Sequence, residues 1–372
     1  MRQLNKILGI VIATAFTLNV SATVWRVNNN SSVDADFNDL SNAYNAASAG
    51  DTLYIEGSGT DYTDDLTINK KIIIIGPGFH LDKNDSTQAN QNTARWRGWI
   101  RFQPGAEGSE IHGMDIYETG YINGCYSRTM VDIDCDSVSL IRNRIYWTYT
   151  GSSSSYNMLN ICDNHSDVTL IGNWMISQYN NNNCLRVGSA CTSILVANNF
   201  IAQSRNSTTN PLSYNNSYYA IYTESNSNNR ITFLNNVIQG RWRSYYCTNL
   251  NNIHITGSID RSQSTWYNNI DYSTGIPSGN GNQQNVSYTS IFERTTNGAA
   301  EWWEDENYWR LLPAGPAVGA GVSGEDCGMF GGALKFNPSG LPAIPAIFNA
   351  TIPATTDKGS GLSIDISSKS HK

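Results

Sequence analysis

An asparagine that follows a short apolar stretch recurs along this chain, and it constrains the fold more than any other feature. The clearest copies share the pattern apolar, any residue, apolar, two residues, Asn, any residue, apolar. Their asparagines are Asn143, Asn173, Asn199 and Asn236, and weaker copies begin at Ile72, Ser109 and Ile253. From residue 109 to residue 253 the copies begin 22 to 37 residues apart. A period of this length indicates a fold made of stacked repeats.

Each repeat contains short apolar alternations and no long amphipathic pattern, which favours strands over helices. Stacked coils of strands place equivalent positions about 4.8 Å apart. Asparagines at one bend then form a ladder in which each side-chain amide bonds to its neighbours. Asparagine also tolerates the left-handed backbone of a sharp bend. The sequence therefore predicts an all-β solenoid with the four asparagines stacked at one corner.

Three further stretches accompany the repeats: TVWRVNNN, AGDTLYIEGSG, and GPAVGAGVSGEDCGMFGG followed by GLPAIPAIF. With them, the chain resembles the right-handed parallel β-helix of the pectate-lyase-like superfamily. Within that superfamily it is similar to secreted bacterial β-helix-repeat proteins of unassigned activity. The resemblance implies a single-stranded right-handed parallel β-helix, and it brings no activity with it.

The chain divides into four predicted segments. Residues 1–22 read as a signal peptide, because a positive start and an apolar run precede a small-residue cleavage site. Residues 23–51 form an N-terminal cap, residues 52–299 the β-helix, and residues 300–372 a Pro- and Gly-rich C-terminal cap and tail.

Two features of the caps are predicted in more detail. The N-terminal cap contains one short helix, predicted over residues 34–50 with Asp34 or Asp36 as its N-cap. The prolines of GLPAIPAIF suit an extended cover over the last coil. Trp302, Trp303 and Trp309 form either a glycan platform or a plug for that coil.

Composition limits the partners. The net charge is −7, only 15% of residues are charged, and no basic cluster occurs, so we expect no nucleic-acid binding. No segment after the apolar leader is long enough to span a bilayer, so we expect no transmembrane segment in the mature chain. The chain is therefore expected to be secreted or held at the cell surface.

Seven cysteines in an exported chain leave at least one unpaired within a monomer. Two pairs are close enough to be candidates for disulfides: Cys135 with Cys162, and Cys184 with Cys191. The favoured alternative is that the cysteines are buried thiols inside the coils, where they pack as small apolar residues.

One wall of the predicted coils carries candidates for lyase chemistry. Alignment of the repeats stacks Arg101, Asp132, Asn160, Arg186 and Ile221 on the outer face of successive coils. The resemblance to pectate lyases makes Asp132, Asp134 and Asp136 candidate calcium ligands and Arg186 a candidate base. Calcium prefers six to eight oxygen ligands, and the neighbouring coils offer Arg101 and Asn160 instead. The favoured reading is a surface ion pair between Arg101 and Asp132.

The residues after the ladder asparagines form a second candidate surface. Arg144, Trp174 and Phe200 are predicted to point outward in line, with Arg144 over the Trp174 ring. An exposed stripe of this kind marks a binding surface. The alternative is that the loop at residues 202–219 folds back and covers it.

These features support one leading interpretation and two alternatives. The leading interpretation is an exported, non-enzymatic β-helix, without a cofactor, that presents an extended surface for adhesion or glycan binding at the cell exterior. Arg144, Trp174 and Phe200 would contact an extracellular glycan or a surface protein. The first alternative is a calcium-dependent, pectate-like polysaccharide lyase. The second is a structural subunit of a surface assembly.

Overall fold

The computed structural model describes residues 22–82, 87, 90–118, 120–148, 156–178, 182–204, 217–293, 309–353 and 361–370. The predicted signal peptide up to residue 21, together with Trp302 and Trp303, lies outside these ranges. Within them, no helix is long and apolar enough to cross a membrane.

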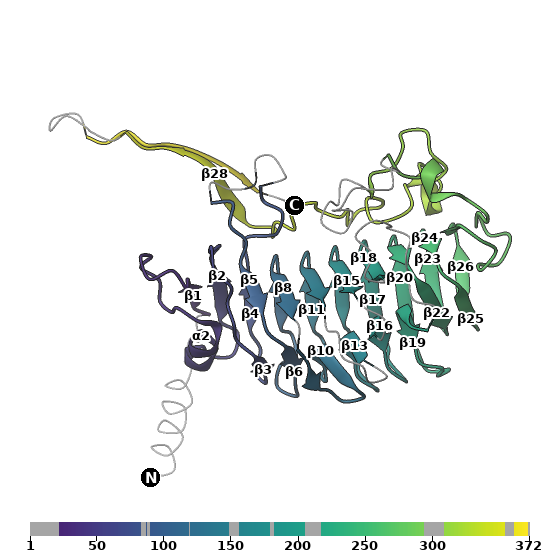
Figure 1. The fold of residues 1–372 in the computed structure, drawn as a ribbon, viewed down its shortest axis with the longest axis horizontal. Coiled ribbons are helices and arrows are strands. Elements are labelled where there is room, and N and C mark those ends of the chain that lie inside the picture. Colours follow the sequence, from purple (N-terminus) through teal and green to yellow (C-terminus); the bar gives the residue numbers. More distant parts are fainter. Residues whose placement is uncertain are drawn as a thin grey trace, which may run out of the picture.

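The chain winds into a stack of coils whose walls are three parallel sheets, here named A, B and C (Figure 1). Sheet A contains β1 (Val24–Val27), β2 (Thr52–Ile55), β4 (Ile73–Ile75), β7 (Glu110–His112), β11 (Ser139–Ile141), β14 (Thr169–Ile171), β17 (Ile194–Ala197), β20 (Ile231–Leu234), β23 (Cys247–Leu250) and β26 (Thr265–Tyr267). Sheet B contains β5 (Arg95–Arg97), β8 (Asp115–Glu118), β12 (Arg144–Trp147), β15 (Trp174–Gln178), β18 (Phe200–Ser204), β21 (Val237–Gln239), β24 (Ile253–Thr256) and β27 (Ile270–Asp271). Sheet C contains β3 (Leu66–Ile68), β6 (Ile100–Phe102), β10 (Arg128–Ile133), β13 (Tyr156–Ile161), β16 (Asn182–Val187), β19 (Tyr219–Thr223), β22 (Arg241–Tyr245) and β25 (Ile259–Ser262), while β9 (Ile122–Asn123) pairs antiparallel with β10. This arrangement confirms the predicted right-handed parallel β-helix.

The core lies inside the coils, because side chains of a strand alternate between the two faces of its sheet. In sheet A, residues that pair on successive strands form one buried apolar column. This column contains Leu53, Ile74, Ile111, Leu140, Leu170, Val196 and Phe233. Equivalent columns from sheets B and C close the interior, so each coil buries its apolar residues against the coils on either side.

The asparagine ladder is confirmed at the corner between sheets A and B. Each side-chain oxygen accepts hydrogen bonds from the backbone and side-chain amides of the preceding ladder residue, so Asn143 donates to Asn173 and Asn173 to Asn199. Asn199 donates to Asn236 in the same way. The ladder then continues past the predicted residues through Asn252, Asn269 and Asn282. All the ladder side chains therefore have their hydrogen-bonding groups satisfied inside the stack.

The first coil is capped by one short helix, α2 (Leu40–Ala46), which is shorter than the predicted helix. Its N-cap is Asp39, whose carboxylate accepts a hydrogen bond from the amide of Asn42 at 2.7 Å, so the prediction of Asp34 or Asp36 is wrong. Asp36 instead accepts a bond from the amide of Arg26 at 2.8 Å.

The stretch GLPAIPAIF does not cover the last coil as predicted, because the Leu341 carbonyl accepts a hydrogen bond from Arg142 on an early coil at 2.9 Å. The segment at residues 309–341, here named the strap, runs back along sheet B toward the first coils (Figure 1). Two hydrogen bonds anchor the strap at its ends. Near the last coil, Asn268 Nδ2 donates to the Ala320 carbonyl at 2.8 Å. Near the first coils, the amide of Phe79 donates to the Ser339 carbonyl at 2.8 Å. Beyond the strap, β28 (Pro345–Thr351) and β29 (Asp365–Ser370) form an antiparallel hairpin.

Candidate functional site

The predicted binding stripe is aligned but not exposed. Arg144, Trp174 and Phe200 pair in register on β12, β15 and β18. Trp174 and Phe200 have 0% of their surface exposed, and Arg144 has 8%. The Trp174 and Phe200 rings stack with centroids 4.1 Å apart, while the Arg144 guanidinium lies over Tyr146 and contacts Asp115 at 3.4 Å.

The strap is what buries the stripe. Phe336 packs against Trp174 at 5.9 Å between ring centroids, and Trp309 packs against Phe200 at 4.9 Å. These four side chains belong to one buried apolar cluster that also contains Met329. The assignment of Arg144, Trp174 and Phe200 as ligand-binding residues is therefore wrong. The apolar rings on the outer face of sheet B are covered by the strap, a later part of the same chain. The alternative cover, the loop at residues 202–219, lies mostly outside the described residues.

The outer face of sheet C has the predicted register over four coils. Arg101, Asp132, Asn160 and Arg186 pair on successive strands. The fifth position is Tyr222 rather than Ile221, because Tyr222 is the residue of β19 that pairs with Arg186. Arg243 and Asp260 continue the same outer column.

The three aspartates predicted for calcium do not form a metal site. Asp132 lies 3.5 Å from Arg101 Nε and accepts from Asn160 Nδ2 at 2.8 Å, and burial raises the pKa of its carboxyl group. Asp134 contacts Arg101 and His165, and Asp136 contacts His165 at 3.0 Å. Within the described residues, these carboxylates do not converge at ligand distance from one another. Each carboxylate instead contacts an arginine or a histidine from a neighbouring coil.

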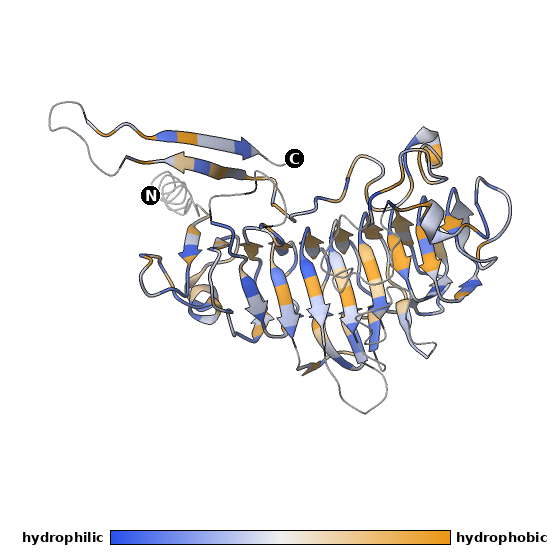
Figure 2. Cartoon of the chain, turned by 45° about the horizontal axis from the view of Figure 1, so that its top comes forward, coloured by the Kyte–Doolittle hydropathy of each residue, from blue (hydrophilic) through white to orange (hydrophobic). Residues whose placement is uncertain are grey.

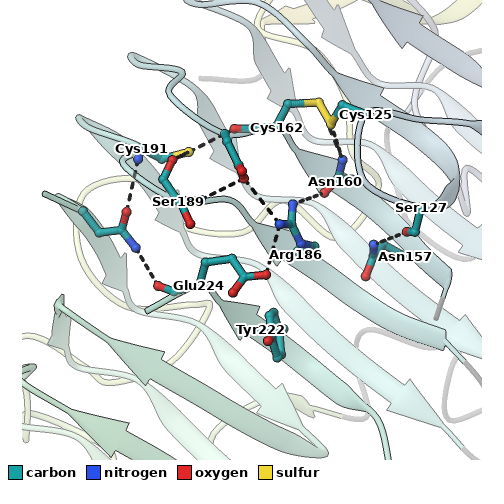
Figure 3. A network of polar contacts seen from close by, with 12 residues as sticks. Cys125, Ser127, Asn157, Asn160, Cys162, Arg186, Ser189, Cys191, Tyr222 and Glu224 are labelled. Atoms are coloured by element: carbon teal, nitrogen blue, oxygen red, sulfur yellow. Dashed lines mark hydrogen bonds and ion pairs between the residues drawn. A yellow bond between two sulfur atoms is a disulfide. The ribbon is translucent and has the colours of Figure 1, made fainter. Parts of the chain in front are cut away.

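Arg186 is held in place and is unsuited to act as a base. Its guanidinium donates to Asn160 at 2.9 Å and lies 3.3 Å from Asp163 and 3.1 Å from Glu224 (Figure 3). The Tyr126 ring covers it, with its centroid 3.6 Å from the guanidinium carbon. A guanidinium offers only N–H donors and no acceptor, so it has no lone pair with which to take a proton from a substrate. The prediction of Arg186 as a candidate base therefore gains no support from its surroundings.

A disulfide fastens the loop that carries Tyr126. Cys125 and Cys162 are joined, with their Cα atoms 6.0 Å apart, so neither predicted disulfide pair is correct (Figure 3). The other five cysteines are buried free thiols, as the favoured alternative predicted; these are Cys135, Cys184, Cys191, Cys247 and Cys327. Cys125 also lies beside sheet C, because its amide donates to the Asp132 carboxylate at 3.2 Å and its sulfur accepts from Asn160 Nδ2 at 2.9 Å. The next residue is Tyr126, whose ring covers Arg186.

Tyrosines and amides surround a hollow beside Arg186. This hollow, here named the sheet-C groove, has a volume of about 180 Å³. It is lined by Tyr126, Asn157, Asn183, Arg186, Ser217, Tyr218, Tyr219 and Tyr222. Asn183 bridges two coils, because its side chain donates to Asn157 and accepts from the Tyr219 amide, both at 2.9 Å. These two hydrogen bonds hold the Asn183 side chain in place between Asn157 and Tyr219.

The next strand extends the groove with alternating cations and rings. Arg241 contacts Asp260 at 2.9 Å and lies over the Tyr219 ring at 4.2 Å. Arg243 lies between two rings, 4.5 Å from the centroid of Tyr222 and 4.3 Å from that of Tyr245. Within the described residues, no ion pair joins Arg243 to a carboxylate.

The sequence contains a signal for this surface that the repeat alignment did not use. In RWRSYY, residues 241–246, cations and an aromatic residue recur at every second position. In a strand this alternation puts Arg241, Arg243 and Tyr245 on one face and Trp242 and Ser244 on the other. The structure has this arrangement, because Trp242 and Ser244 are buried and the other three are partly exposed.

By its coil architecture the chain belongs to the class of right-handed parallel β-helix proteins. No family model and no curated protein sequence matches it. Among solved structures, it is similar to the crystal structure of pectate lyase Pel9A, with 12% sequence identity and a TM-score of 0.41. That match covers 84% of this chain and 97% of the lyase chain. The likeness concerns the coils, and a fold brings no chemistry with it.

Proposed function

We propose that the chain is an exported carbohydrate-binding protein whose binding surface is the sheet-C groove together with Arg241, Arg243 and Tyr245. One observation carries the proposal. The guanidinium of Arg243 lies between the rings of Tyr222 and Tyr245, and no carboxylate among the described residues pairs with it. The proposal replaces the buried stripe of Arg144, Trp174 and Phe200 as the docking face.

The composition of the groove suits a sugar chain. Binding sites of this kind combine aromatic faces with a few fixed polar groups that set the orientation of the ligand. Tyr126, Tyr219 and Tyr222 supply rings, while the side chains of Asn157 and Asn183 supply amide groups for hydroxyls. Because the outer column continues over several coils, the surface can follow an extended polymer rather than a single ring.

The charges favour sugars that carry carboxylates. Arg186 and Arg241 are already paired with carboxylates, whereas no carboxylate among the described residues forms an ion pair with Arg243. A guanidinium presents a planar fork of donors that matches a carboxylate. The stacked rings reduce the freedom that Arg243 would lose on binding, and so lower the entropic cost.

Export remains part of the proposal and rests on the leader-like residues at the start of the sequence. A disulfide on the binding face agrees with folding in an oxidising compartment. Together these features are consistent with a protein that meets glycans outside the cell.

A binding panel tests the proposal. Purified protein would be run by affinity electrophoresis through gels containing polygalacturonate, alginate, or a neutral glucan, each with and without calcium. We expect retardation by the acidic polymers and little by the neutral one. Absence of retardation in every gel would contradict the proposal. Unsaturated product absorbing in the ultraviolet, formed only with calcium, would instead establish the lyase alternative.

A further inference from the structure

Two sulfur atoms and a carboxylate oxygen converge beside sheet C. Most strands of the coils combine hydrophilic and hydrophobic residues (Figure 2), and on β10 the hydrophilic Asp132 lies between Val131 and Ile133. Asp132 Oδ1 lies 3.6 Å from the Sγ atom of Cys125 and 3.6 Å from that of Cys162. The three atoms lie within 4.8 Å of one another, and this group is here named the sulfur–carboxylate cluster.

The surroundings of Asp132 direct one of its two oxygens at the sulfurs. Oδ2 accepts from the Cys125 amide at 3.2 Å and lies 3.5 Å from Arg101 Nε. Oδ1 faces the two sulfurs and accepts from Asn160 Nδ2 at 2.8 Å. Hydrogen bonds of this kind orient the ligands of metal sites in proteins, so the carboxylate is already oriented as a ligand.

Asn160 also supports the sulfurs. Its Nδ2 atom lies 2.9 Å from Cys125 Sγ and 3.6 Å from Cys162 Sγ (Figure 3). An N–H donor beside a thiolate stabilises it, because hydrogen bonding to the charged form favours that form. Gly124 brings the loop close, since a Cβ atom there would lie 2.6 Å from Asp132 Oδ1. Glycine at this position therefore lets the backbone approach the carboxylate.

The spacing fits a tetrahedral metal ion once the disulfide is opened. Zinc binds thiolate sulfur at about 2.3 Å and carboxylate oxygen at about 2.0 Å, which places two such ligand atoms about 3.5 Å apart. The sulfur-to-oxygen distances of 3.6 Å in the cluster agree with this separation. Two thiolates lie about 3.8 Å apart in the same geometry. The Cα atoms of Cys125 and Cys162 are 6.0 Å apart, so rotation of the side chains suffices to separate the sulfurs.

We propose that the sulfur–carboxylate cluster, when its disulfide is reduced, is a zinc site with Cys125, Cys162 and Asp132 as its protein ligands. Cysteine sulfur favours zinc over calcium, which prefers oxygen ligands. Cys125 is exposed, whereas Asp132 is fully buried. One side of the site is therefore open to solvent, and a water molecule takes the fourth position of the tetrahedron.

Reduction and metal binding replace one link by another. A dithiol reductant transfers two electrons and two protons to the disulfide, becomes a disulfide itself, and leaves two thiols. Zinc then displaces both thiol protons. The two thiolates and the carboxylate carry three negative charges, which Zn²⁺ and the Arg101 guanidinium beside Asp132 balance. Both states join Cys125 to the coil that carries Cys162. The site requires no glycan, so this inference goes beyond the proposed binding surface.

Cobalt(II) is the probe, because it occupies zinc sites and its thiolate complexes absorb light. The purified chain would be reduced with a phosphine, which takes its oxygen from water and does not compete for the metal as a dithiol does. After desalting without oxygen, the chain is titrated with Co²⁺ while its absorption spectrum is recorded, and Zn²⁺ is then added. The oxidised chain is titrated in parallel.

Three variants separate the ligands from their surroundings. Cys125→Ser removes one thiolate at an exposed position, and Asp132→Asn replaces the carboxylate by an amide of the same shape. Asp134→Asn, which alters the next aspartate on the same wall, is the matched control. Circular dichroism melts report whether each variant retains the folded stack.

We expect the reduced wild-type chain and Asp134→Asn to bind one cobalt ion, with thiolate absorption that zinc removes. The oxidised chain, which retains five buried thiols, should show no such absorption. Cys125→Ser should abolish it, and Asp132→Asn should raise the cobalt dissociation constant at least about tenfold. Because Cys125 is exposed, its variant remains a valid test if Asp132→Asn fails to fold. A reduced wild-type chain without thiolate absorption, or absorption that Cys125→Ser leaves unchanged, would overturn the proposal.

Discussion

Asn173 donates its side-chain amide to the side-chain oxygen of Asn199 at 3.0 Å, and its second amide hydrogen goes to the Leu140 carbonyl at 2.8 Å. Its own oxygen accepts from the backbone and side-chain amides of Asn143. One side chain thus connects three coils at a corner where water has no access.

Removal of this side chain should destabilise the stack. Asn173→Ala removes the acceptor of the buried Asn143 backbone amide and the side-chain donor to the Leu140 carbonyl. The Asn199 oxygen loses one of its two hydrogen bonds and keeps the one from the backbone amide of residue 173. Buried groups without partners cost about 1–3 kcal/mol each, so we expect a loss on the order of 3 kcal/mol. The free energy of unfolding in urea measures it, with Asn228→Ala at an exposed position as the control. A midpoint equal to that of the control would rule out a supporting role for the ladder.

Acid should weaken a buried pair near the last coils. His254 and Asp271 have no exposed side-chain surface, and His254 Nδ1 lies 2.8 Å from the Asp271 carboxylate. Burial acts to raise the pKa of Asp271, but the hydrogen bond and charge of His254 and the Gly275 amide outweigh burial and lower it. The ionised carboxylate therefore stabilises the fold fully above about pH 3.9, the ordinary aspartate pKa, and this contribution is lost as the pH falls through the lowered value.

The matching experiment compares Asp271→Asn with the wild-type chain by urea unfolding at pH 7 and at pH 3. We expect the variant to be less stable by about 3 kcal/mol at pH 7, and this difference to shrink at pH 3. Asp365→Asn, in the exposed hairpin, should show no difference at either pH. A difference that stays constant with pH would mean that ionisation of Asp271 contributes nothing.

The strap should contribute to stability through its aromatic anchors. Phe336→Ala opens a space against Trp174, and removal of a buried phenylalanine costs about 3–5 kcal/mol. Val318→Ala changes an exposed residue of the same segment and should cost little. Chemical unfolding of both variants measures the difference. Equal stability would mean that the strap does not pack on sheet B in solution.

Thiol titration should separate the disulfide from the buried cysteines. Burial raises the pKa of Cys135, Cys184, Cys247 and Cys327 to about 12, so these thiols resist reaction in the folded protein. In denaturant without reductant, five thiols should react with a thiol reagent, and seven after reduction. Seven reactive thiols before reduction would exclude the disulfide between Cys125 and Cys162.

The repeating part of the fold was predictable because each coil carries its own pattern. The ladder residues and the paired apolar positions depend on neighbours one coil away, so their period is visible in the sequence. The predicted register of the outer column was wrong by one residue on β19, where Tyr222 rather than Ile221 pairs with Arg186. The position of the N-cap was missed because several aspartates precede α2, and each is a suitable capping residue.

Contacts between distant segments could not be predicted in the same way. The strap joins Asn198 to the Met329 carbonyl across 131 residues, and no periodic pattern records such a contact. Because the sequence did not predict that the strap packs on sheet B, Trp174 and Phe200 were predicted to be exposed. Likewise, Cys125 lies on a loop between repeats, so its pairing with Cys162 has no counterpart in the repeat spacing.

The affinity of the sheet-C groove for an acidic sugar chain tests the central claim most directly. Isothermal titration of polygalacturonate oligomers would compare the wild-type chain with Arg243→Gln, Tyr222→Ala and the strap variant Val318→Ala. Loss of a charge-assisted hydrogen bond costs about 1.5–3 kcal/mol, so Arg243→Gln should weaken binding roughly tenfold or more. Tyr222→Ala should weaken it as well, and Val318→Ala should bind like the wild-type chain. Binding that is unchanged in both groove variants would contradict the assignment of this surface.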